Sequence, residues 1–195
     1  AMTFIILLVA IIPCCIKLML SKTDTPRNFM KPLIICAASS FMFGWHVHEK
    51  AILMILIPLQ VLTFHYKSEA GSSLFVSIFG LYSLTPLLFT NELILIKLSL
   101  FVAYIAFNIF AFRTIHGYRL LYVHERLYSL GIIFLPLYEN FIQHLFKLDE
   151  KLPFLPLMLT SVYCSLGMIY FWFKFYGEFL LDSTDGDTKK KHKKK

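Results

Sequence analysis

The stretch that decides the fold is PFLPLMLTSVYCSLGMIYFWF, residues 153–173. It has no charged residue over 21 positions, and about 20 largely apolar residues suffice for a helix to cross a bilayer core about 30 Å thick. The whole chain of 195 residues shares this character, because 57% of it is hydrophobic and only 16% is charged, with a mean hydropathy of +0.67. Soluble domains carry about 25% charged residues. We therefore exclude an ordinary soluble domain and expect an all-α polytopic membrane protein.

Further apolar runs, bounded by polar clusters, lie on the N-terminal side of this stretch. Together they predict about seven transmembrane helices within residues 1–181, followed by a basic tail at 182–195. The expected spans lie near 3–20, 29–45, 51–64, 72–89, 93–112, 127–146 and 153–176. The two short runs within 29–64 are also compatible with a re-entrant hairpin. The run 127–146 is the weakest, since polar residues crowd its second half.

The basic residues of the linkers predict the orientation. Seven crossings place the two chain ends on opposite sides, and the side richer in Lys and Arg is expected in the cytosol. The side of the tail holds Lys22, Arg27, Lys31, Lys67, Arg113, Arg119, Arg126 and the tail lysines, whereas the other side holds only Lys50, Lys147 and Lys151. We therefore expect a cytosolic tail, with residues 44–50 in the opposite compartment. If 127–146 only lies on the membrane surface, everything upstream reverses.

The formal net charge of +7 does not indicate a nucleic-acid partner. Six of the 19 basic residues are lysines of the segment 189–195, so the body of the chain is almost neutral. The cysteines Cys14, Cys15, Cys36 and Cys164 all sit inside apolar runs and lack metal-ligand spacing. We expect them to be reduced packing residues rather than a redox or metal site. The expected environment is the lipid bilayer, with no cofactor and no metal.

One polar cluster interrupts the apolar pattern, at His46-Val47-His48-Glu49-Lys50. Four ionisable groups in five positions at a membrane boundary are costly, which favours a functional site. Lys50 can neutralise an anion as a point charge, and a histidine can donate a hydrogen bond or a proton near neutral pH. Glu49 could orient a histidine or pair with Lys50. We therefore predict an anion-binding site here.

Alternatives to this interpretation stay open at the level of sequence. The cluster could consist of interfacial polar residues solvated by head groups, or His46 and His48 could begin a metal site. A helix through the cluster would bring His46 to the face of Glu49 and Lys50 and add its dipole to anion binding. An extended segment would instead place His46, His48 and Lys50 on one side.

A family resemblance emerges from three stretches. Residues 43–53, FGWHVHEKAIL, resemble the signature of the endoplasmic-reticulum α-1,3-glucosyltransferases that extend the lipid-linked oligosaccharide for protein N-glycosylation. The later runs 152–164, LPFLPLMLTSVYC, and 82–90, YSLTPLLFT, look more like the second enzyme of that pair than the first. No familiar motif occurs between residues 112 and 151.

The resemblance implies a GT-C-type membrane glycosyltransferase that takes glucose from dolichyl-phosphate-glucose and works on the lumenal side. Its acceptor would be the dolichyl-diphosphate-linked Glc1Man9GlcNAc2 glycan, and a β-linked donor giving an α-1,3 product means inversion. On this basis we expect His46, His48 and Lys50 to contact the donor phosphate and Glu49 to position them. The tail also resembles a dilysine retrieval signal, with Lys191 and Lys193 at the fifth and third positions from the end. A polybasic segment that attracts anionic lipids is the alternative.

One expected feature of the family is not found in this chain. The acidic residue taken as the catalytic base lies in a large lumenal loop near an aspartate-tyrosine-proline-proline motif, which does not occur here. We therefore expect the chain to be the C-terminal portion of the enzyme and assign no catalytic residue within it. The alternative is a non-catalytic multispan binding or assembly protein of the endoplasmic reticulum that kept this fold. A small transporter or channel would need more polar residues along its spans than the chain offers.

Overall fold

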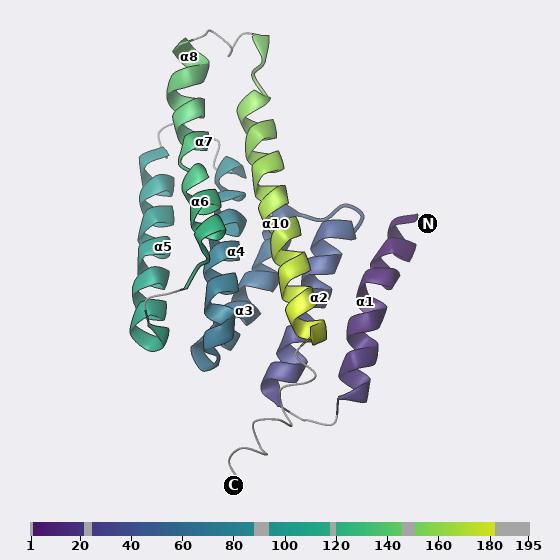
Figure 1. The fold of residues 1–195 in the computed structure, drawn as a ribbon. Coiled ribbons are helices and arrows are strands. Elements are labelled where there is room, and N and C mark those ends of the chain that lie inside the picture. Colours follow the sequence, from purple (N-terminus) through teal and green to yellow (C-terminus); the bar gives the residue numbers. More distant parts are fainter. Residues whose placement is uncertain (1, 22–24, 88–93, 118–119, 146–150, 182–195) are drawn as a thin grey trace. The chain divides into compact units, whose positions relative to one another are not determined.

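A computed structural model describes residues 2–21, 25–87, 94–117, 120–145 and 151–181. All regular structure in these ranges is helical, with no strand (Figure 1). Within the described residues, each of the seven apolar runs expected from the sequence contains helical structure. The chain divides into two compact units, one made of residues 1–59 with 170–195 and the other of residues 60–169.

The first unit contains α1 (Met2–Leu20), α2 (Pro26–Phe43), the 3-10 turn η1 (Glu49–Ile52), the start of α3 (Leu53–His65) and the end of α10 (Leu155–Leu181). Helices α1 and α2 lie side by side, and the Cys14 thiol contacts the carbonyl of Pro32 at 3.8 Å (Figure 1). The Lys17 ammonium donates hydrogen bonds to the carbonyls of Phe179 and Leu180, the latter at 2.9 Å. Lys17 thus caps the last turn of α10, where helical carbonyls have no partner of their own.

The second unit is built around α4 (Ala70–Tyr82), which follows the 3-10 turn η2 (Lys67–Glu69). Every residue from Ala70 to Gly80 is buried, including three serines, so this part of α4 is covered on all sides. Its small residues permit close packing, since a Cβ atom on Gly71 would stand 2.2 Å from the carbonyl oxygen of Leu120.

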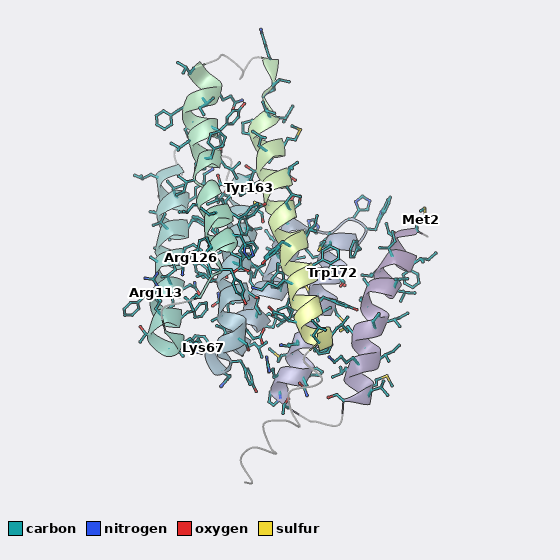
Figure 2. All side chains as sticks on the ribbon, viewed as in Figure 1. Met2, Lys67, Arg113, Arg126, Tyr163 and Trp172 are labelled. Atoms are coloured by element: carbon teal, nitrogen blue, oxygen red, sulfur yellow. The ribbon has the colours of Figure 1, made fainter. Side chains whose placement is uncertain are left out.

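Helix α5 (Ile94–His116) packs against α4 and keeps large apolar side chains on its outer surface, as lipid-facing helices do. It ends at Gly117, whose φ of +94° is the left-handed conformation typical of a helix C-terminus. Lys67, Arg113 and Arg126, which the sequence assigns to one side of the membrane, lie in the same part of this unit (Figure 2).

The expected span 127–146 is not one continuous α-helix. It consists of α6 (Val123–Gly131), α7 (Phe134–Leu137), a π-helical turn η5 (Tyr138–Ile142) and α8 (Gln143–Leu145), and residue 146 lies outside the described ranges. Pro136 has no N–H, so the carbonyl of Ile132 accepts a bond from Leu135 at 3.2 Å instead. The side-chain amide of Asn140 donates a hydrogen bond to the carbonyl of Pro136 at 2.8 Å.

Three described helices are long and apolar enough to cross a membrane, namely Met2–Leu20, Leu95–His116 and Leu155–Leu181. Helices α3 and α4 have 13 residues each, which corresponds to about 20 Å of helix against a bilayer core of about 30 Å. The expected span 72–89 begins two residues after the start of α4, which stops at Tyr82 and is followed within the described residues by the 3-10 turn η3 (Thr85–Leu87). Residues 88 and 89 lie outside the described residues. The expected tail, residues 182–195, lies outside the described residues.

Candidate functional site

The polar cluster predicted from the sequence, His46 to Lys50, lies in the connection between α2 and η1 within the first unit. Helix α2 ends at Phe43, and the N–H of Gly44 closes its last turn on the carbonyl of Ser40 at 2.9 Å. Gly44 itself is extended, with φ −68° and ψ 151°. A Cβ atom here would stand 2.4 Å from the Ser40 oxygen and 2.6 Å from Cγ2 of Val47. Close backbone approach therefore requires glycine at this position.

The turn that follows is made by His46, the one described non-glycine residue with a positive φ, at 54°. This left-handed conformation is uncommon for a residue with a side chain and costs about 1–2 kcal/mol. Its imidazole packs edge-to-face on the indole of Trp45, with ring centroids 5.1 Å apart. Backbone strain of this kind is concentrated at functional sites. The conformation of His46 is therefore a second reason to regard the cluster as a candidate functional site.

The chain then re-enters helical structure at Glu49. His48 is extended, with φ −73° and ψ 144°, and its carbonyl accepts the N–H of Ala51 at 2.9 Å. Glu49 and Lys50 belong to the 3-10 turn η1, and the α-helix proper begins at Leu53. Both conformations considered from the sequence are therefore wrong, because His46 lies outside the helix and the segment is not extended through Lys50.

All four ionisable side chains, those of His46, His48, Glu49 and Lys50, are exposed. The neighbouring Trp45 is 75% exposed, whereas Ile52 is fully buried and anchors the end of η1. With neutral imidazoles the cluster has no formal net charge, so recognition of an anion would depend on the hydrogen-bond donors of the histidines together with Lys50.

Other residues considered from the sequence are not part of this site. Within the described ranges, no group of three or more His, Cys, Asp or Glu side chains is placed to hold a metal ion. The four cysteines are free thiols. The expected retrieval residues Lys191 and Lys193 lie outside the described residues.

Sequence reasoning missed one residue beside this site. Trp172 lies within the apolar run 153–173, yet its indole donates a hydrogen bond to Ser39 on α2, 133 positions away in the chain. No local pattern could have indicated a pair at this separation.

Comparison with known proteins identifies the family. Residues 1–175 match the family described as "ALG6, ALG8 glycosyltransferase family". The chain is 43% identical to the probable dolichyl pyrophosphate Glc1Man9GlcNAc2 alpha-1,3-glucosyltransferase of Drosophila melanogaster, over 89% of this chain and 34% of that protein. It is 40% identical to the Bos taurus enzyme, over 96% of this chain and 36% of that protein, and 33% identical to the Arabidopsis thaliana enzyme, over 87% and 36%.

The chain thus spans about a third of the length of the curated relatives it matches. No solved structure matches it. The match over residues 1–175 covers most of the chain and includes the cluster at the end of α2. This chain belongs to the ALG6, ALG8 glycosyltransferase family.

Proposed function

We propose that the chain is part of an inverting α-1,3-glucosyltransferase of the endoplasmic-reticulum membrane, which acts in protein N-glycosylation. Its donor is dolichyl-phosphate-glucose and its acceptor is the dolichyl-diphosphate-linked glycan Glc1Man9GlcNAc2. The names of relatives that are 33–43% identical to the chain support the acceptor. The donor is inferred from the resemblance of residues 43–53 to the family signature.

The observation that carries the proposal is the exposed cluster His46 to Lys50 on a strained turn between two helices. In the reaction, an acceptor hydroxyl attacks C1 of glucose while the bond from C1 to the phosphate oxygen breaks. The bonding electrons leave with the dolichyl phosphate, which gains negative charge in the transition state. Lys50 and the imidazoles of His46 and His48 stabilise that charge, and Glu49 positions them. The base that accepts the hydroxyl proton is not assigned to this chain.

In this proposal the chain forms a GT-C-type bundle of seven spans, with the cluster in the lumen and the tail in the cytosol. The lysine and arginine bias of the linkers supports this orientation. Helices α2, α3 and α4 and the interrupted series α6 to α8 would then supply the shorter crossings. Their polar and irregular backbone must be shielded from lipid by neighbouring helices. Lys191 and Lys193 would return the protein to the endoplasmic reticulum.

The proposal is tested by profiling lipid-linked oligosaccharides in cells that carry His46→Ala, His48→Ala or Lys50→Gln at the chromosomal locus, beside wild type and a null. The variants and the null should accumulate Glc1Man9GlcNAc2. Accumulation of unglucosylated Man9GlcNAc2 in the null would indicate the first enzyme of the family instead. A normal profile in the null would refute the glucosyltransferase. A defect in the null with normal profiles in all three variants would favour a non-catalytic assembly role.

A further inference from the structure

The last turn of α2, which precedes the cluster, is held by Trp172 of α10 within the same unit (Figure 2). The indole Nε1–H donates a hydrogen bond to Oγ of Ser39 at 2.9 Å. The indole ring also packs edge-to-face on Phe43, with centroids 5.7 Å apart and an interplanar angle of 85°. Ser39 and Phe43 are four residues apart and share one face of the helix. A single side chain therefore contacts two successive turns at the end of α2.

The hydrogen bond to Ser39 makes the contact between Trp172 and α2 specific. The side chain of Ser39 is fully buried, and a buried hydroxyl that loses its partner is costly. The terminal turn of a helix frays readily unless side chains fix it. Trp172 therefore supplies both a directional bond and apolar packing at the point where α2 would otherwise be loosest.

The position of Trp172 is fixed by contacts within α10 and, through Tyr176, by α1. Its ring lies 5.1 Å from the ring of Tyr176, one turn further along α10. The Tyr176 hydroxyl donates a hydrogen bond to the carbonyl of Ala10 in α1 at 3.0 Å. The position of the indole is thus set by α1 as well as by α10, and the end of α2 is tied to both helices.

The cluster begins directly after this fixed turn. Phe43 touches Trp172, Gly44 closes the helix on Ser40, and His46 makes the left-handed turn only three residues after Phe43. A change in the direction of the last turn of α2 would move the backbone of His46 and His48 with it. Over so short a distance the chain has little freedom to compensate.

We infer that Trp172 is a positioning residue for the donor-phosphate site, acting through Ser39 and Phe43 on the backbone that carries His46, His48 and Lys50. This inference rests on the proposed function of the cluster. It assigns Trp172 no contact with the donor. Its effect is to hold the cluster where the phosphate is bound.

The test uses Trp172→Phe, which keeps an aromatic ring but removes the N–H, and Ser39→Ala, which removes the acceptor. The matched control is Ser165→Ala, which removes an exposed hydroxyl bonded only to the Val162 carbonyl of its own helix. Each is made in the protein as the cell produces it, and initial rates are measured with dolichyl-phosphate-glucose and the lipid-linked acceptor varied separately.

Each of the two variants should raise the KM for the donor about 3- to 10-fold, the worth of one hydrogen bond, with the KM for the acceptor unchanged. The double variant should be no worse than either single one, because both remove the same bond. A variant that only destabilised the protein would lower the amount of active enzyme and leave both KM values unchanged.

Normal donor KM values in Trp172→Phe and Ser39→Ala, with a raised donor KM in His48→Ala, would overturn the positioning role and leave the proposed function standing. A normal donor KM in His48→Ala would refute the role of the cluster, and the positioning role with it. If Trp172→Phe does not accumulate, Ser39→Ala alone decides the question.

Discussion

Gly44 is the position where adding one methyl group should disturb the cluster most. A Cβ atom there would lie 2.4 Å from the Ser40 carbonyl oxygen, and real Cβ atoms essentially never approach closer than 3.0 Å. The Ser40 oxygen belongs to the backbone of α2 and cannot rotate away, whereas Cγ2 of Val47, at 2.6 Å, can move with its side chain. Relief of the first clash thus requires the backbone to shift by about 0.6 Å, at a cost of about 1–3 kcal/mol by analogy with overpacked cores.

This shift falls on the hydrogen bond that closes α2, from the Gly44 N–H to the Ser40 oxygen, and so changes the direction in which the chain leaves the helix. A misplacement of about 1 Å can lower the rate of an enzyme about 100-fold. For Gly44→Ala we expect a fall in glucose transfer of at least about 10-fold, with the protein still present in the membrane. The assay is the initial rate of transfer from dolichyl-phosphate-glucose, normalised to the amount of protein by immunoblot.

Gly177→Ala is the matched control, because no atom lies within 4 Å of the Cβ position at Gly177 in α10. The same methyl group in an open helix interior should leave the rate unchanged and stabilise the helix by about 0.5–1 kcal/mol. Wild-type rates in both variants would refute the reasoning, since the steric demand at Gly44 would then have no bearing on the site. Equal losses in both would show that glycine replacement acts through something other than the clash.

Substitutions at three further positions test other features of the structure. His46→Gly should keep the left-handed turn and remove only the imidazole, whereas His46→Val should also strain the turn by about 1–2 kcal/mol. A lower rate of glucose transfer in His46→Val than in His46→Gly would show that the backbone conformation matters in addition to the imidazole. Equal rates in the two variants would argue against a role of the backbone conformation. Tyr128→Phe removes the hydroxyl that donates to the Tyr163 carbonyl at 2.6 Å, and thermal unfolding in detergent should show a loss of about 1 kcal/mol, with an unchanged Tm contradicting the expectation. Gly167→Ala places a Cβ atom 2.9 Å from the ring of the buried Phe79 and should lower the Tm, at a cost of about 1–3 kcal/mol. Gly177→Ala should not lower the Tm, and a Tm of Gly167→Ala equal to that of the wild type would contradict the expected clash.

The hydropathy of the sequence was sufficient to locate the helices. It did not indicate where a helix is interrupted or how far a helix is buried. Each apolar run contains helix because a backbone in lipid must satisfy its hydrogen bonds internally. The break after Gly131 is different, since it depends on Pro136 and on the packing of Tyr163, whose hydroxyl would lie 2.3 Å from a Cβ atom on Gly131. Likewise, the burial of Ala70 to Gly80 in α4 depends on packing against α5 and α6. Long-range packing of this kind leaves no periodic signal.

In the cluster, too, some features could be predicted from the local sequence, whereas others depend on packing between residues that are distant in the chain. The residue types of the cluster, concentrated between two apolar runs, identified it as a candidate anion site from the sequence. The left-handed conformation of His46 could not be foreseen, because only a few per cent of non-glycine residues adopt a positive φ and no local pattern singles out this histidine. It persists because its flanks are fixed, by the closed turn at Gly44 on one side and by the buried Ile52 on the other.

The side chains of the cluster contrast with this fixed backbone, since all four ionisable groups are exposed. A strained backbone is stable only where its surroundings over-determine it. The helix turn that precedes His46 is held in turn by the contacts of Trp172 with Ser39 and Phe43. The free energy that holds the turn is therefore supplied by packing between helices, and the exposed side chains remain available to a ligand. A site built in this way should lose affinity through substitutions in the helix contacts as well as through substitutions of the ionisable groups themselves.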